Sequence, residues 1–226
     1  MQRTFPPMGP ILDPRWSPDG RFIAFMELKD RESTIYLVPV DGGAPLLLLS
    51  GDFQPGDPTW SPDGKSIAYG GESEATTNAT EIRTLNLESK KSETVPGSHG
   101  LFSPRWSPDG QFLVAQSADI TQLFLYSFQS GAWRQLPAPK PPKGRFVGWP
   151  AWSHDSRYLY FMDGLDVYRA RIPEGSVELV AKTANTDIIC PVFAWGFWFG
   201  LTPDDRILVL RDRGIEEIYA LDLEYR

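Results

Sequence analysis

The sequence is poor in the residues on which many enzyme mechanisms depend. It has one cysteine, Cys190, and two histidines among 226 residues. A single cysteine cannot form an internal disulfide, so the fold must be stable without one. Cys190 lies in the apolar run DIICPVF, far in sequence from either histidine, and we expect it to be a small buried side chain. Two histidines cannot supply a metal site built from several imidazoles, and they leave few groups for acid–base catalysis.

Long hydrophobic segments are also missing. The longest apolar run covers residues 192–201, well short of the roughly 20 residues that a membrane-spanning helix needs. The first residues, MQRTFPPMGPIL, show neither the apolar core nor the cleavage site of a signal peptide. We therefore expect a soluble chain with no membrane segment. Its compartment stays open: cytoplasmic as the chain stands, or periplasmic if it ends a longer anchored protein.

Positive charge is in the minority, with 22 Lys and Arg against 29 Asp and Glu and a net charge of −7. A nucleic-acid-binding surface needs a basic face that neutralises phosphates. The basic residues here are scattered along the chain, so we expect no nucleic-acid partner. Aromatic residues make up 13%, including eight tryptophans, and such large side chains need a packed interior.

What the sequence has in abundance is internal repetition. The pattern Pro-x-Trp-Ser occurs four times, at intervals of 44, 46 and 46 residues. Its tryptophans are Trp16, Trp60, Trp106 and Trp152. A fifth, less regular copy reads FGLTPDDRILVL, with Leu201 in the Trp position. Short β-rich runs separated by turn residues follow each copy, and no long window has the 3.6-residue period of a helix. Four antiparallel strands repeated every 40 to 50 residues or so are typical of β-propeller blades.

We therefore predict an all-β fold, a single β-propeller domain over residues 1–226 with about five four-stranded antiparallel blades. The predicted blades lie near 12–50, 57–96, 103–139, 149–182 and 190–226. The last blade ends after its third strand, and we predict that residues 2–5 supply the fourth and close the ring. Phe5 precedes its Trp by the same distance as the ends of the outer strands in other copies. Two alternatives stay open: a frayed N-terminal tail, or a piece of a larger propeller.

The Ser-Pro-Asp-Gly that follows the Trp predicts a hairpin turn. Pro has the fixed φ that suits the second turn position, Asp fits the third, and Gly adopts the left-handed conformation that closes the hairpin. The repeated Trp is expected to wedge between neighbouring blades, because such a large side chain stabilises most when buried. We therefore interpret the four tryptophans and the turn aspartates as structural rather than as a repeated active site. These aspartates are Asp19, Asp63, Asp109, Asp155 and Asp204.

The units PRWSPDGRFIAF, PTWSPDGKSIAY and PRWSPDGQFLVA resemble the WD-like repeats of the TolB-like β-propeller family. The resemblance covers four units well and the fifth in part. The C-terminal stretch FGLTPDDRILVLRDRGIEEIYALDLE is similar to the last blade of propellers that end bacterial winged-helix regulators or protein kinases. The resemblance implies a role in a bacterial signalling or regulatory system. It also implies six or more blades, which departs from the count of five.

Recognisable catalytic motifs are missing: the sequence has no G-x-S-x-G, H-E-x-x-H or P-loop pattern. Propellers bind ligands with loop side chains around one channel mouth, so loops that lead into the innermost strands are the place to look. The candidate binding residues in or beside these loops are Asp13, Arg15, Asp57, His99, Arg105 and Trp149. The expected function is a non-catalytic binding module for a protein or peptide, or for a small ligand, without metal or cofactor.

Two other functions stay open. The first is a propeller enzyme or an accessory domain of one, because some TolB-like propellers accompany peptidase domains and some related propellers are lyases or hydrolases. The peptidase version needs an α/β-hydrolase domain, and the metal version needs several histidines near the propeller axis. The second is a structural fragment that assembles only with further blades.

Overall fold

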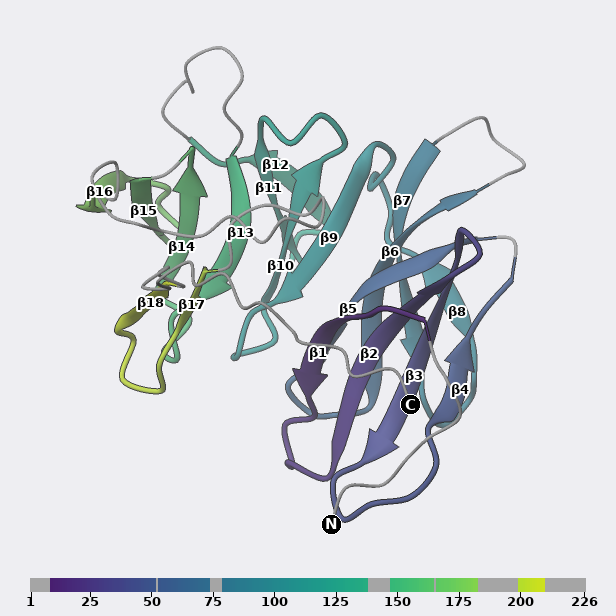
Figure 1. Cartoon of the computed structure of the whole chain (residues 1–226). Coiled ribbons are helices and arrows are strands. Elements are labelled where there is room, and N and C mark those ends of the chain that lie inside the picture. The colour runs from purple at the N-terminus through teal and green to yellow at the C-terminus, as the bar shows by residue number, and fades with distance from the viewer. Residues whose placement is uncertain are drawn as a thin grey trace, which may run out of the picture.

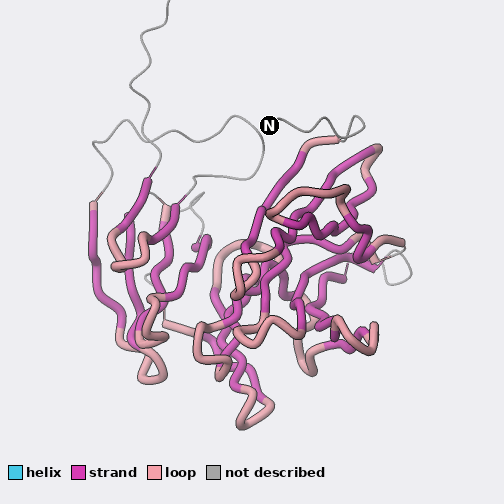
Figure 2. The backbone as a smooth tube through the Cα atoms, turned by 90° about the horizontal axis from the view of Figure 1, so that it is seen from below, coloured by secondary structure: helices cyan, strands magenta, loops and turns pink. Residues whose placement is uncertain are grey.

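The described part of the chain is built from β-strands, turns and loops without a helix (Figure 2). The computed structural model describes residues 9–51, 53–73, 79–137, 147–164, 166–182 and 199–209. These residues form eighteen strands, sixteen of them in four antiparallel sheets of four strands each (Figure 1). Within each sheet the strands are hydrogen-bonded in chain order. The predicted all-β propeller of four-stranded antiparallel blades is therefore confirmed.

The strands of the four complete blades have the following bounds. Blade 1 contains β1 (Ile11–Trp16), β2 (Phe22–Lys29), β3 (Glu32–Pro39) and β4 (Leu46–Leu49). Blade 2 contains β5 (Pro55–Trp60), β6 (Ser66–Ser73), β7 (Ala79–Asn86) and β8 (Ser92–Thr94). Blade 3 contains β9 (Leu101–Trp106), β10 (Phe112–Ser117), β11 (Leu123–Ser127) and β12 (Ala132–Gln135). Blade 4 contains β13 (Val147–Trp152), β14 (Tyr158–Asp163), β15 (Asp166–Arg171) and β16 (Val177–Ala181).

A fifth unit contributes the antiparallel pair β17 (Phe199–Leu201) and β18 (Ile207–Val209). The first strands of successive units, β1, β5, β9, β13 and β17, follow one another as the innermost strands (Figure 1). Figure 1 shows β1 and β17 apart, at the two ends of this row. Residues 2–5, which were predicted to close the last blade, lie outside the described residues, so ring closure stays a prediction.

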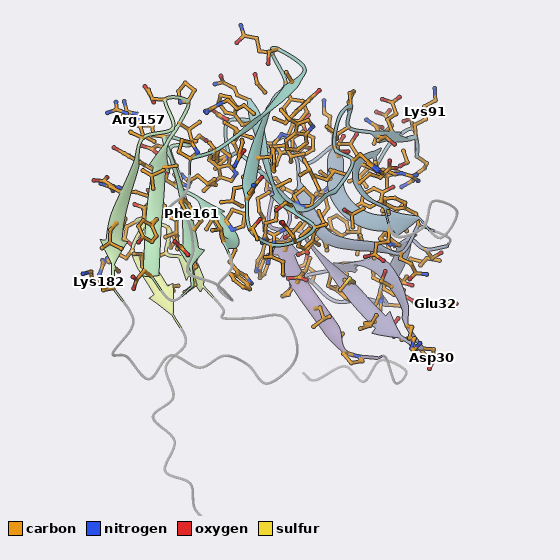
Figure 3. The ribbon with its side chains drawn as sticks, turned by 90° about the horizontal axis from the view of Figure 1, so that it is seen from above. Asp30, Glu32, Lys91, Arg157, Phe161 and Lys182 are labelled. Atoms are coloured by element: carbon orange, nitrogen blue, oxygen red, sulfur yellow. The ribbon has the colours of Figure 1, made fainter. Side chains whose placement is uncertain are left out.

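The hydrophobic core lies between neighbouring blades. Val114 and Leu125 of blade 3 belong to the same buried cluster as Leu159 and Phe161 of blade 4. A second cluster joins blades 2 and 3 in the same way. In Figure 3, Phe161 lies within the body of blade 4, while the labelled charged side chains lie at the periphery. Each blade buries its apolar faces only by stacking on the next, as expected for a repeat protein.

The turn after each inner strand is fixed by its serine and aspartate. Ser107 Oγ donates a hydrogen bond of 2.6 Å to Asp109 Oδ1 and accepts one of 2.9 Å from Phe112 N. Asp109 Oδ1 also accepts from Gln111 N at 3.0 Å. The same carboxylate-to-hydroxyl contact recurs in the other four turns, with Thr202 in place of serine in the last. The recurrent Asp thus tightens the hairpin beyond what turn conformation alone requires.

These hydrogen bonds also stabilise the ionised turn carboxylates. The Ser17 hydroxyl and the Arg21 amide lower the pKa of Asp19 to about 2. The pKa values of Asp63, Asp155 and Asp204 are lowered for similar reasons. These four aspartates therefore remain ionised at neutral pH and act as hydrogen-bond acceptors.

The repeated tryptophans connect the inner strands of adjacent blades. Trp60 Nε1 donates to Arg15 O at 3.1 Å, and Trp152 Nε1 donates to Arg105 O at 3.0 Å. In both cases the acceptor is the carbonyl just before the Trp of the preceding blade. Trp16 differs, because no described blade precedes it and its side chain is left 60% exposed.

Candidate functional site

Each of the four complete inner strands has a β-bulge three residues before its Trp. The residues at this position have φ values between 50° and 52°, and they are Asp13, Asp57, Ser103 and Trp149. The register with the second strand shifts at the same place in every blade. A left-handed conformation is costly for non-glycine residues, yet it recurs here with three different side-chain types. The bulge therefore belongs to the scaffold, and the residue that occupies it sets the local chemistry.

Four charged side chains meet along the inner strands of blades 1 to 3. Arg105 Nη2 on β9 lies 3.1 Å from Asp57 Oδ1 on β5, and Arg105 Nη1 donates to Pro104 O at 2.8 Å. Arg15 Nη2 lies 3.8 Å from Asp13 Oδ1, both on β1. We call Asp13, Arg15, Asp57 and Arg105 the inner-strand cluster. The Arg105–Asp57 pair is the more buried one, with side chains 15% and 23% exposed.

Like charges lie close together in this cluster. Burial and the neighbouring Asp57 carboxylate raise the pKa of Asp13 to about 6, and Asp57 also hydrogen-bonds the protonated form. The Arg105 guanidinium, followed by burial, lowers the pKa of Arg15 to about 10. The Asp13 side chain is 35% exposed, so water screens part of this repulsion. The cluster thus holds two carboxylates and two guanidiniums in which each sign of charge has a like charge nearby, a setting suited to binding a charged group.

A pocket of 310 Å³ opens at the turn end of the same three inner strands. We call it the tryptophan pocket. Its lining residues are Arg15, Trp16, Pro18, Thr59, Trp60, Pro62, Trp106, Ser107 and Pro108. Arg15 belongs both to this pocket and to the inner-strand cluster. Sequence reasoning assigned the tryptophans to the scaffold and missed their second role as a pocket wall, although equivalent repeat positions in adjacent blades are expected to lie side by side.

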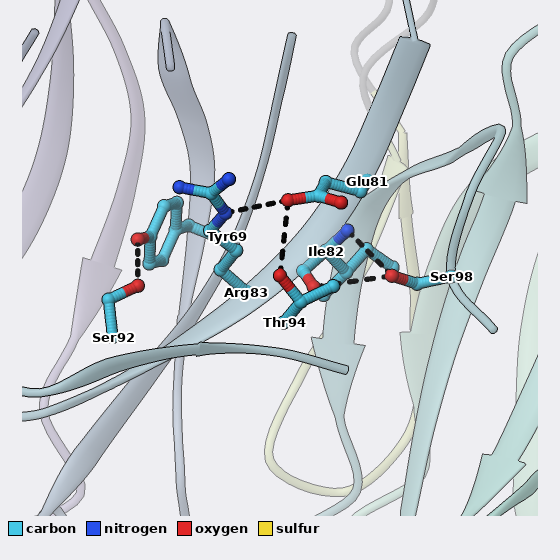
Figure 4. A network of polar contacts seen from close by, with 7 residues as sticks. All are labelled: Tyr69, Glu81, Ile82, Arg83, Ser92, Thr94 and Ser98. Carbon is cyan, nitrogen blue, oxygen red and sulfur yellow. Dashed lines mark hydrogen bonds and ion pairs between the residues drawn. The ribbon is translucent and has the colours of Figure 1, made fainter. Parts of the chain in front are cut away.

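The other two candidate residues lie apart from the cluster. His99 is exposed on the loop between β8 and β9. Its neighbour Ser98 anchors this loop, because Ser98 Oγ accepts from Ile82 N at 3.0 Å and donates to Ile82 O at 3.2 Å (Figure 4). Trp149 packs against a buried cluster that includes Tyr160 and Met162 of blade 4. The structure therefore brings together four of the six candidate residues.

Blade 2 carries a further polar network on its outer strands. Glu81 Oε1 accepts from Arg83 Nε at 2.7 Å and from Thr94 Oγ1 at 3.2 Å, and Tyr69 Oη lies 2.7 Å from Ser92 Oγ (Figure 4). Arg83 also lies over the ring of Phe53, 3.8 Å from its centroid. These groups satisfy one another, so the network ties the outer strands together rather than presenting free charge.

A larger groove, of 530 Å³, lies between blades 3 and 4. Its charged lining residues already have partners in the protein. Asp109 and Asp155 accept hydrogen bonds within their turns, Arg157 lies 3.9 Å from Asp155, and Arg134 donates to Pro173 O. This groove is therefore a weaker candidate than the tryptophan pocket.

The described residues show no arrangement typical of metal or triad chemistry. Among them, no group of three or more His, Cys, Asp and Glu is placed to hold a metal ion. His154 is exposed, and its backbone N donates to Asp205 Oδ1 at 2.9 Å. Cys190 lies outside the part of the chain that the structure describes. A search of the same residues finds no helix long and apolar enough to cross a membrane.

The four-stranded sheets and the row of neighbouring inner strands define the fold as a β-propeller. TolB from Acinetobacter baumannii superposes with a TM-score of 0.65 at 22% identity, covering 88% of this chain and 53% of its own. A chain in the crystal structure of a nidogen/laminin complex has a TM-score of 0.61 at 10% identity, covering 76% of this chain and 65% of its own. At these identities the likeness establishes the fold, and the expected resemblance to TolB-like propellers is confirmed at that level.

One curated relative is similar in sequence. Dipeptidyl-peptidase 5 from Aspergillus fumigatus is 28% identical, and the match covers 82% of this chain and 29% of the relative. The chain thus spans less than a third of that relative and little more than half of the Acinetobacter TolB. No family model matches the chain.

Proposed function

We propose that this β-propeller is a non-catalytic binding module that holds a protein or peptide partner through its inner strands. The observation that carries the proposal is the inner-strand cluster, in which three blades bring two guanidiniums and two carboxylates together. Partly buried charged groups that lie near like charges are stabilised when a ligand supplies hydrogen bonds and opposite charge. A solved nidogen/laminin complex contains a chain of the same fold, which supports protein binding by propellers of this kind.

The enzyme alternative has less support from the described residues. The relative with a peptidase name is more than three times as long as the match, so its activity does not transfer to this chain. Neither His99 nor His154 has a ring nitrogen hydrogen-bonded to a Ser, Thr or Cys side chain within the described ranges. Acyl transfer by a serine or cysteine nucleophile needs such a base within reach.

The test is peptide panning with paired-charge variants. Random phage-displayed peptides are selected on the wild-type protein, and their affinities are then measured for the Asp57→Asn plus Arg105→Gln double variant. This variant removes one charge of each sign, with Asn matching the shape of Asp and the shorter Gln keeping a polar side chain in place of Arg. We expect selected peptides to bind it at least tenfold more weakly, because a buried charged hydrogen bond contributes about 1.5–3 kcal/mol.

The matched control is Arg169→Gln plus Glu178→Gln, which removes an ion pair on the outer strands of blade 4. Peptides that bind both double variants as tightly as wild type would remove the cluster from the site. A panel of fluorogenic dipeptide substrates tests the non-catalytic part: turnover that scales with protein concentration would overturn it.

A further inference from the structure

The tryptophan pocket has the chemistry of a site for a specific ligand class, and this inference rests on the proposed binding function. We propose that the pocket binds an aromatic carboxylate, with the carboxylate held by Arg15 and the ring held against Trp16, Trp60 and Trp106. The C-terminal aromatic residue of a peptide and a free aromatic acid share this chemistry.

The pocket wall is mostly apolar and contains one charged residue. Three tryptophans and three prolines make up most of the lining, and Arg15 is the charged residue among them. The Ser107 hydroxyl already donates to Asp109, and Thr59 Oγ1 accepts from Trp106 N at 3.3 Å. The carboxylates of the cluster do not line the pocket. A cation in the pocket would therefore be repelled by Arg15, with no carboxylate in the lining to offset this. An anion would be attracted to the Arg15 guanidinium, which lies beside an aromatic wall.

Arg15 is the less satisfied of the two cluster arginines. Its contact with Asp13 is 3.8 Å long, compared with 3.1 Å for Arg105 and Asp57. Arg15 Nη1 donates to Pro14 O at 3.1 Å, which uses one of its five N–H donors. A carboxylate matches the planar fork of the guanidinium and binds it through two parallel hydrogen bonds. The nearby Arg105 charge adds to the attraction for an anion, and the Asp13 and Asp57 carboxylates offset part of it.

Size and exposure favour a single aromatic ring as the apolar part. The pocket volume of 310 Å³ lies at the lower end of ligand pockets, which span roughly 300–1,000 Å³. Trp16 is 60% exposed and presents its ring to an incoming ligand, while Trp60 is held in place by its bond to Arg15 O. Aromatic pairs attract each other beyond the effect of the area that they bury. Ring stacking and the ion pair together give the pocket a preference for ligands that carry both groups.

Isothermal titration calorimetry tests the inference with three probes. They are N-acetyl-phenylalanine, its neutral amide, and a ten-residue peptide that ends in phenylalanine with a free carboxylate. We expect the acid to bind at least tenfold more tightly than the amide. Arg15→Gln should abolish this difference, whereas Arg21→Gln, an exposed arginine paired within its own turn, should leave it unchanged. Equal affinity for acid and amide, or an unaltered preference in Arg15→Gln, would overturn the inference.

A second variant tests the pocket in case Arg15→Gln fails to fold. Trp16→Phe removes no hydrogen bond described for that side chain, so the fold should be kept while acid binding weakens several-fold. Unchanged acid binding in this variant would also count against the pocket. A peptide that binds more tightly than N-acetyl-phenylalanine identifies a polypeptide C-terminus as the source, and equal binding identifies a small acid. Selected peptides that depend on Arg105, in a protein that binds neither acid, would refute this inference and leave the proposed function standing.

Discussion

The joint between blades 2 and 3 and the joint between blades 3 and 4 use different interactions at equivalent positions. At the first joint, Gly110 has no side chain, and a Cβ added to it would lie 3.6 Å from Pro62 Cγ, so the neighbouring turn lies close to the glycine. At the second joint, Ser156 takes the place of the glycine, and its Oγ accepts a hydrogen bond of 3.0 Å from Asp109 N. A glycine turn thus packs on its neighbour, whereas the serine turn hydrogen-bonds to it.

The tryptophans repeat this contrast. Trp152 Nε1 donates to Arg105 O at 3.0 Å across the second joint. At the first joint, the buried Trp106 Nε1 has no hydrogen-bond partner among the described residues, and Trp106 N donates to Thr59 Oγ1 instead. The first joint also contains the Arg105–Asp57 ion pair. The two joints therefore use equivalent residue positions but form different hydrogen bonds and ion pairs. The stability of a repeat protein is roughly the sum of the contributions of its repeats and of such interfaces.

The departures from the repeat are therefore informative. Ser156 has a φ of 60° and Asp205 one of 59°, both in the place of the turn glycine. Each uses its side chain to accept a hydrogen bond from the preceding turn, at Asp109 N and His154 N. The turn copies that lack the glycine therefore join adjacent blades in a second way. A hydrogen bond from the preceding turn offsets the cost of their left-handed backbone.

The largest loss of stability should come from removing the buried serine hydroxyl of the turn, which both joints share. Ser107→Ala and Ser153→Ala each remove a buried hydroxyl, 0% and 1% exposed, that donates to the turn aspartate and accepts from the next strand. We expect each to lower the free energy of unfolding by about 2 kcal/mol, measured by urea titration, because two hydrogen bonds are lost and a half-buried backbone amide loses its side-chain acceptor. Ser130→Ala, on an exposed turn, is the control. A large difference between the two variants would show that the joints differ in more than their turns.

The different hydrogen bonds of Trp152 and Trp106 predict a smaller change in the free energy of unfolding than the serine variants. Trp152→Phe loses a hydrogen bond to the preceding blade, whereas Trp106→Phe loses none that the described structure shows. We expect Trp152→Phe to be the more destabilising by about 1 kcal/mol in urea unfolding, since the loss of packing is similar for both. Equal destabilisation would indicate that the Trp152 hydrogen bond contributes nothing net.

The turn contrast is tested at the glycine position. Gly110→Ala should cost about 1 kcal/mol, because φ is 75° there while the space for a Cβ is adequate. Ser156→Ala should cost a similar amount, because the hydrogen bond from Asp109 N is lost. Ser156→Gly should change thermal stability little, because the relief of backbone strain offsets the same loss. A strongly destabilised Ser156→Gly would mean that the hydrogen bond outweighs the strain.

The smallest effect should appear at the joint between blades 1 and 2, where Asp13 faces Asp57, Arg105 and Arg15. A raised pKa of about 6 means that the ionised carboxylate destabilises the fold above this pH, and that the penalty disappears as the pH falls from about 6 to 4. Asp13→Asn should therefore stabilise the protein at pH 8, by at most about 1 kcal/mol after solvent screening, and by less at pH 5.

Thermal unfolding of wild type and Asp13→Asn across this pH range tests whether the substitution stabilises the protein more at pH 8 than at pH 5. The four turn aspartates with lowered pKa values act in the opposite direction, but those pKa values, about 2 for Asp19, confine that loss of stability to more acidic conditions. A variant whose stability profile between pH 5 and pH 8 matches that of wild type would show that Asp13 and Asp57 do not repel each other across this joint.

The sequence by itself determined the class of fold. The Pro-x-Trp-Ser spacing and the alternating runs predicted strands, hairpins and about five four-stranded blades, because turn chemistry and strand patterning are local properties of a few adjacent residues. The described residues show four of these blades complete. The four predicted residues of the inner-strand cluster were found by the same logic, since residues just before the repeated Trp lie on the innermost strand. The local pattern also explains why the turn aspartates were read as scaffold.

Only the tertiary structure decided which of these residues meet. Asp57 and Arg105 are 48 positions apart, and their contact depends on how far each blade is rotated and shifted relative to the next. The same stacking creates the tryptophan pocket from residues of three repeats, and it leaves His99 exposed and Trp149 packed within blade 4. A repeat specifies the shape of one blade through local bonds. The distances between blades follow from side-chain packing across the joints, which no single repeat encodes.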